Sequence, residues 1–153
     1  MSVSLFYFAA WCFYSVVVGW GMMRVYLHWW GRPVRFIDVM RAIGAWAIQS
    51  ISIGVFVGII GTNVMGYAVA GFGSGLLGGF FTALTLRWAG LPVTARILGR
   101  SAIVWGALFV APFVLVHDLP QYLVGILMIG AGAGGACYLA HLLAARFPEP
   151  GRI

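Results

Sequence analysis

The chain has 153 residues, of which 63% are hydrophobic and 8% are charged, and its mean hydropathy is +1.02. An average soluble domain is about 45–50% apolar and about 25% charged, so this composition excludes a soluble globular domain. The high hydropathy also excludes a disordered chain. The net charge of +6 does not indicate nucleic acid as a partner, because the arginines lie between apolar blocks, where they set membrane topology. We therefore expect an all-α polytopic membrane protein.

The apolar blocks predict five membrane-spanning helices, each needing about 20 apolar residues. The first block ends in aromatic and basic residues, and Gly31 and Pro33 then break the helix. Residues 42–86 carry no charge and would be about 67 Å long as one helix. This is more than twice the thickness of a bilayer core, which is about 30 Å, so the run must fold back. Residues 61–63, Gly-Thr-Asn, predict the turn, with Thr or Asn capping the next helix. The whole chain, 1–153, is then a single transmembrane domain with spans at 5–27, 36–60, 64–88, 96–116 and 121–145.

The arginines predict the orientation of these spans. All nine fall on one side of a five-span arrangement, whereas a four-span arrangement would place them on both sides. Short loops rich in Lys or Arg stay cytoplasmic, so the N-terminus is expected outside and the C-terminus in the cytoplasm. The basic residues are all arginine, which is typical of a GC-rich bacterial gene. We expect the bacterial inner membrane.

Small residues recur at helical spacing in three spans, a glycine-zipper pattern that lets helices pack closely in lipid. Counted from a turn near residue 62, Gly54 lies level with Gly71 and Ser50 with Gly75, which predicts a close antiparallel hairpin of the second and third spans. Either these stripes only pack the monomer, or one of them, that of the last span, faces another subunit. The expected helix-packing residues are Ser50, Gly54, Gly58, Gly71, Gly75, Gly79, Gly130 and Gly134.

Polar groups that could carry chemistry are scarce. None of the three acids lies in the middle of a span, which disfavours proton-coupled transport. Asp38 lies within four positions of Arg35 and Arg41, which predicts a local salt bridge. We find no nucleophile–base pair, metal-ligand spacing or phosphate loop, and we expect no enzymatic activity and no metal. His28 and His141 lie near the cytoplasmic ends of two spans, a placement that axial haem ligands also show. Because both also suit interfacial anchors, we expect no haem and no other cofactor.

Four arginines suggest a lipid ligand. They sit at headgroup level near tryptophans, and basic pockets between helices on the cytoplasmic side bind anionic lipid headgroups. The alternative is that these residues only set topology. The residues concerned are Arg35, Arg41, Arg96 and Arg100.

The number of spans and the many tryptophans resemble the translocator protein family in architecture. The proline-tryptophan-rich loop motif of that family is absent from residues 28–35, so no family is assigned. The sequence favours a non-catalytic accessory or scaffold subunit of a larger membrane complex in transport, secretion or electron transfer, which binds other subunits or itself. The alternatives are a small oligomeric channel or carrier for a neutral or apolar solute, and a haem-binding electron-transfer subunit.

Overall fold

The computed structural model describes residues 3–60, 63–115 and 118–145. The described chain is all-helical, as predicted, and four of its helices (α2 to α5) are long and apolar enough to cross a membrane. This composition is compatible with a membrane protein. The five helices are α1 (Val3–Trp29), α2 (Phe36–Ile60), α3 (Val64–Trp88), α4 (Ala95–Val114) and α5 (Gln121–Ala144).

The helix limits follow from local signals in the sequence. Asn63 caps α3, because its side chain accepts a hydrogen bond of 2.8 Å from the backbone N–H of Gly66. The other two residues of the predicted turn, 61–62, lie outside the described residues. So does Val116, at which the fourth span was expected to end. Helix α1 extends two residues beyond the predicted span at each end.

Two glycines end the helices that lead into the first and third connections. Gly31 has φ +60° and Gly90 has φ +90°, values that favour glycine. At the end of α1, Arg32 N–H bonds Leu27 C=O at 2.8 Å and Gly31 N–H bonds His28 C=O at 3.1 Å. The same pair of bonds forms around Gly90, so both helices end in a Schellman motif. These two sharp ends let the next helix turn back.

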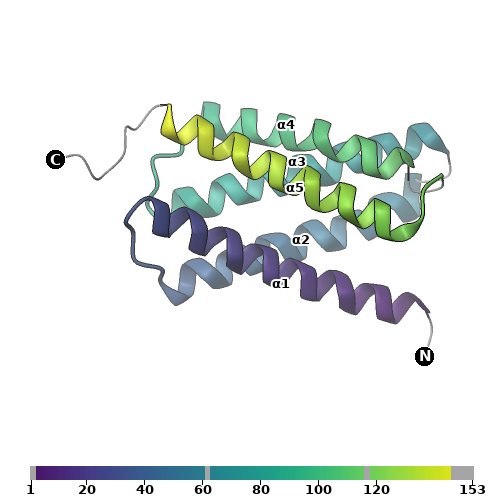
Figure 1. Ribbon diagram of the computed structural model, residues 1–153, viewed down its shortest axis with the longest axis horizontal. Helices are drawn as coiled ribbons and strands as arrows, with labels where there is room; N and C mark the ends of the chain where they lie inside the picture. The colour runs from purple at the N-terminus through teal and green to yellow at the C-terminus, as the bar shows by residue number, and fades with distance from the viewer. Residues whose placement is uncertain (1–2, 61–62, 116–117, 146–153) are drawn as a thin grey trace.

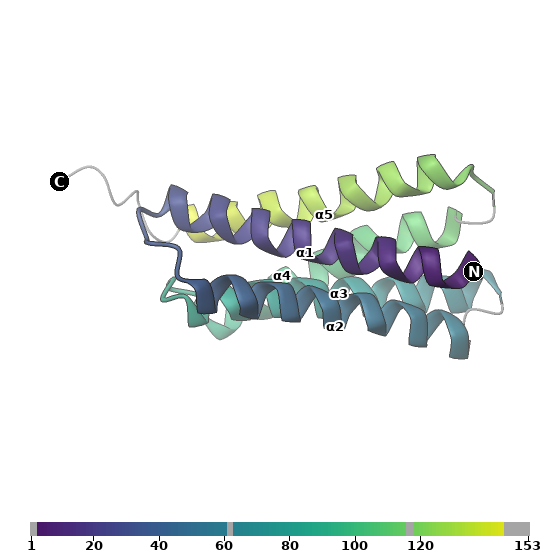
Figure 2. The same cartoon turned by 90° about the horizontal axis from the view of Figure 1, so that it is seen from below.

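Each helix packs against its neighbours in chain order, and α3 and α4 make the most extensive contact. Figure 1 shows the connections α1–α2 and α3–α4 and the end of α5 at one end of the bundle, and the start of α1 at the other. Figure 2 shows α5 on the opposite side of the bundle from α2. The helices thus form a curved row, in which α1 and α5 are the two ends.

The end of the bundle that holds these two connections is the arginine-rich end. Every arginine in the described part of the chain lies in or beside them, and each is exposed. The residues are Arg24, Arg32, Arg35, Arg41, Arg87, Arg96 and Arg100.

The glycine stripe of α3 packs against α4, so the predicted pairing of the small stripes of α2 and α3 is wrong. A Cβ on Gly75 would lie 2.5 Å from Trp105 O, and one on Gly79 would lie 2.6 Å from Ser101 O. Gly71 approaches Phe109 O equally closely, at 2.7 Å. The physical reason is that α4 brings its own small residues, Ala102 and Gly106, and its backbone carbonyls against the stripe, so the two helices can approach closely.

Helix α2 contacts α3 through other residues. Gln49 and Phe56 of α2 pack against Gly78 and Gly73 of α3, and Gln49 is buried. The stripe of α2 itself faces outward, because a Cβ on Gly54 or Gly58 would meet no atom within 4 Å. The two helices are therefore neighbours, with large side chains of α2 meeting small positions of α3.

Candidate functional site

The first and last helices enclose an apolar groove of about 690 Å³. Pockets of about 300–1,000 Å³ are typical of small-ligand sites. Contacts between α1 and α5 are far fewer than between consecutive helices, so the two walls stand apart. Among described residues the α1 wall consists of Val17, Val18, Gly21, Met22, Val25, Tyr26 and Trp29, and the α5 wall of Ile129, Gly132, Ala133, Ala136, Cys137 and Ala140.

One polar contact ties the two walls together. The phenol of buried Tyr26 donates a hydrogen bond to the backbone carbonyl of Ala136, 110 positions away in the chain. This bond satisfies the phenol, so it offers the groove no free donor. It also sets the depth of α5 relative to α1, since Tyr26 and Ala136 lie at the same level.

The groove occupies the half of the bundle next to the arginine-rich end. Its α5 wall runs from Ile129 to Ala140, about 17 Å at the helical rise. Val25, Trp29 and Ile129 are more than half exposed, so the groove opens sideways onto the outer surface of the bundle. In a membrane that surface would face lipid.

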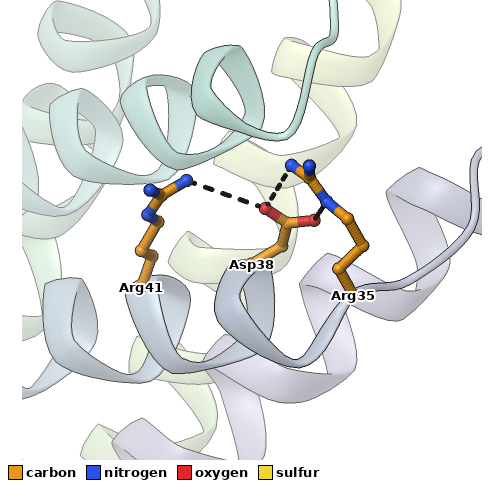
Figure 3. Close-up of polar contacts among 3 residues, drawn as sticks. All are labelled: Arg35, Asp38 and Arg41. Atoms are coloured by element: carbon orange, nitrogen blue, oxygen red, sulfur yellow. Dashed lines mark hydrogen bonds and ion pairs between the residues drawn. The ribbon is translucent and has the colours of Figure 1, made fainter.

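A second polar feature lies at the arginine-rich end (Figure 3). Asp38, 1% exposed, accepts hydrogen bonds from Arg35 Nε at 2.8 Å and from Arg35 Nη2 at 3.0 Å. Arg41 Nη1 lies 3.9 Å from the same carboxylate. The predicted local salt bridge of Asp38 is thus confirmed. Hydrogen bonding and charge attraction by Asp38 raise the pKa of Arg35, so that guanidinium stays charged.

The four arginines predicted to bind anionic lipid differ in their surroundings. Arg35 and Arg41 share Asp38, which offsets part of their charge. The Arg41 guanidinium also lies 5.7 Å from the centre of the Trp88 ring, a cation–π contact. Arg96 and Arg100 lie exposed on the first turns of α4, outside this cluster. All four remain accessible to a headgroup.

His28 of α1 and His141 of α5 lie on the sides of these helices that face away from the groove. At about 100° per residue, His28 is about 160° around α1 from Tyr26, and His141 is about 140° around α5 from Ala136. Since Tyr26 and Ala136 mark where the two helices meet, both imidazoles face away from the facing helix. This arrangement does not favour a shared haem between α1 and α5.

The remaining predicted packing residues divide between core and surface. Ser50 is half-buried, and its hydroxyl bonds the Trp46 carbonyl at 2.9 Å within α2. Gly130 of α5 faces open space, whereas a Cβ on Gly134 would lie 3.3 Å from Leu108 of α4. Gly135 of α5 lies close to α4, since a Cβ there would be 2.5 Å from the Trp105 ring.

Trp105 is the large side chain at the centre of the bundle. It is fully buried, and its ring meets that of Trp46 edge-on with centroids 6.1 Å apart. Within the described residues, its indole Nε1 finds no hydrogen-bond acceptor. The indole packs against Gly135 of α5 and the Trp46 ring of α2, whereas the carbonyl oxygen and Cβ of Trp105 lie against the glycine stripe of α3.

Searches of protein-family models, of curated proteins and of solved structures give no match to this chain. The function must therefore be argued from the residues.

Sequence reasoning did not predict the groove. Its walls come from α1 and α5, which no short connection joins. Their relative depth therefore cannot be predicted by counting residues from a turn. One signal was present: the α5 wall is small at almost every position, with Gly132, Ala133, Ala136 and Ala140 on one face. Small residues on one wall leave space where the facing helix does not approach closely, as is the case for α1 and α5.

Proposed function

We propose that the protein is a non-catalytic accessory or scaffold subunit of a larger membrane complex in transport, secretion or electron transfer. In this proposal the chain crosses the bilayer five times, with α1 as the fifth span. The observation that carries it is the outer face of α2. This face is exposed along the length of the helix and combines bulky apolar side chains with open glycines.

The outer face of α2 suits a partner helix. Ile48, Ile51 and Val55 are about half exposed. Next to them, Cβ atoms built on Gly54 and Gly58 would meet nothing within 4 Å. In lipid, small residues four apart let a second helix approach closely, whereas lipid chains gain little from them. A glycine surface of this kind is best explained by a helix of another subunit.

The arginine-rich end supports the proposed orientation. Short basic loops remain cytoplasmic, which would put this end of the bundle inside the cell and the start of α1 outside, in a bacterial inner membrane. Reporter fusions test this. A cytoplasm-dependent reporter should be active at the C-terminus and inactive at the N-terminus, and activity at both ends would contradict five spans.

Affinity purification in mild detergent tests the subunit role. The wild-type protein should recover a membrane partner at fixed stoichiometry, and Gly58→Leu should lose it. The matched control is Gly130→Leu, which adds the same side chain to an open position on α5. A partner lost only with Gly130→Leu would move the interface to α5. Recovery of this chain alone would contradict the subunit role.

A second candidate function is a small oligomeric channel or carrier for a neutral or apolar solute. The groove between α1 and α5 favours it, because a lateral apolar opening could admit such a solute. Flux of an apolar dye across the membrane of liposomes that contain only this protein would support a channel or carrier. Flux no greater than that of empty liposomes would contradict this function.

A further inference from the structure

We propose that the groove between α1 and α5 holds one acyl chain of an anionic phospholipid, whose headgroup lies at the arginine-rich end. This inference does not depend on the accessory-subunit role, because it concerns a different face of the bundle. Three features of the groove argue for it: its chemistry, its length, and the charge at its mouth.

The chemistry of the walls selects a hydrocarbon. The described lining side chains are aliphatic, aromatic or small, and the one hydroxyl, that of Tyr26, is already bonded to the Ala136 carbonyl. A polar solute would lose its water here without gaining hydrogen bonds, which is costly. A hydrocarbon chain gains contact with both walls and leaves no polar group unpaired.

The length of the groove selects a lipid chain over a membrane-spanning helix. The α5 wall is about 17 Å long, close to one leaflet, which is about half of a hydrocarbon core of about 30 Å. A spanning partner helix would need a surface along the whole of α5. The groove itself, however, ends at Ile129: Gly125 and Ile126 continue that face of α5 toward its start but do not line the groove.

The mouth of the groove adds the charge. Trp29 lines the groove at this end, and the α1–α2 connection starts directly after it. Arg32 lies in that connection, exposed, and is not part of the Asp38 cluster. A phosphate at the level of Trp29 would therefore lie near a guanidinium that forms no ion pair with an acid among the described residues. Anionic headgroups are favoured at such basic positions.

Two glycines at similar depth provide a matched pair of variants. Gly21 lines the groove, Gly44 lies on the outward part of α2, and a Cβ on either would meet nothing within 4 Å. Gly21→Leu therefore fills the groove, and Gly44→Leu adds the same bulk elsewhere. Ala133→Leu fills the groove from α5, so the proposal stays testable if one variant fails to fold. Arg32→Gln tests the headgroup separately.

The readout is lipid retention by the intact protein. Each variant is reconstituted in a bilayer of equal parts phosphatidylglycerol and phosphatidylcholine with the same acyl chains, extracted in mild detergent, and examined by native mass spectrometry. Wild type and Gly44→Leu should retain one phospholipid, mainly phosphatidylglycerol. Gly21→Leu and Ala133→Leu should retain roughly tenfold less, because Leu excludes about two methylene groups of the chain from contact. Arg32→Gln should keep the lipid and lose the preference for phosphatidylglycerol.

Four results would overturn the proposal. The first is equal lipid retention by the folded Gly21→Leu, Ala133→Leu and Gly44→Leu proteins. The second is equal retention of the two phospholipids by the wild type. The third is a polypeptide partner, or a second copy of the chain, that is lost with Gly21→Leu while lipid retention is unchanged. The fourth is an Arg32→Gln protein that still prefers phosphatidylglycerol.

Discussion

The α3–α4 interface and the α1–α5 interface are built on opposite principles. In the first, backbone meets backbone: glycines of α3 approach carbonyls of α4 so closely that an added Cβ would clash. In the second, two walls stand apart around a groove and are joined by one side-chain hydrogen bond. Both use small residues, so composition alone does not distinguish a sealed interface from an open one. The separation of the two helix backbones does.

The α3–α4 interface is tightly packed, whereas the α1–α5 interface is open to a ligand. Helices α3 and α4 follow one another through a short connection that begins at the Schellman motif of α3, and buried aromatic residues of α4 lie at their interface. Helices α1 and α5 meet only because the row of helices curves round on itself. A ligand can enter the second interface without disturbing the first. The following substitutions test this division, from the largest expected effect to the smallest.

Trp105→Ala should have the largest effect. It empties the fully buried centre of the bundle, and the free energy of unfolding should fall by about 3–5 kcal/mol. Thermal unfolding in detergent, followed by intrinsic fluorescence, measures this. Trp20→Ala is the control, because Trp20 is 47% exposed on α1. If both variants lose the same stability, the core does not lie at Trp105.

Gly75→Ala should come next. The added methyl group would lie 2.5 Å from the Trp105 carbonyl oxygen, so α3 and α4 must move apart, at a cost of about 1–3 kcal/mol. Gly54→Ala makes the same change at an open position of α2 and should be neutral or slightly stabilising. Thermal unfolding of the pair measures the difference, and equal midpoints would contradict the close approach of α3 to α4.

Tyr26→Phe should have a smaller effect, about 0.5–1.5 kcal/mol, because it removes one hydrogen bond and keeps the ring. The movement should appear between α1 and α5 alone, as an increased distance between spin labels on these helices. Ser52→Ala is the control, since that hydroxyl bonds only the Ile48 carbonyl of its own helix. An unchanged distance distribution would mean that this bond does not hold the two walls.

Gly21→Ala should have the smallest effect on stability. Its methyl group enters the open groove, so the midpoint of unfolding should stay unchanged or rise, by at most about 1 kcal/mol through higher helix propensity. The matched comparison is Gly44→Ala. A clear loss of stability with Gly21→Ala alone would show that the α1–α5 interface is as tightly packed as α3–α4.

The sequence by itself determined the helices and where they end. The uncharged run 42–86 was expected to fold back because one helix of that length would be longer than the bilayer core is thick. Helices α2 and α3 have the predicted limits. Gly31 ends α1 where the sequence indicated a break, and Asp38 pairs with a neighbouring arginine as expected from their spacing. Each of these features depends on one continuous stretch of the chain, so the sequence contains all the information it needs.

Only the tertiary structure decided which faces meet. The stripe of Gly71, Gly75 and Gly79 indicated close packing but not its partner, and the partner is the aromatic face of α4, with α2 meeting other positions of α3. The groove between α1 and α5 was equally hidden. The groove depends on how far the row of helices curves. That curvature is set by how the side chains pack at every interface between consecutive helices.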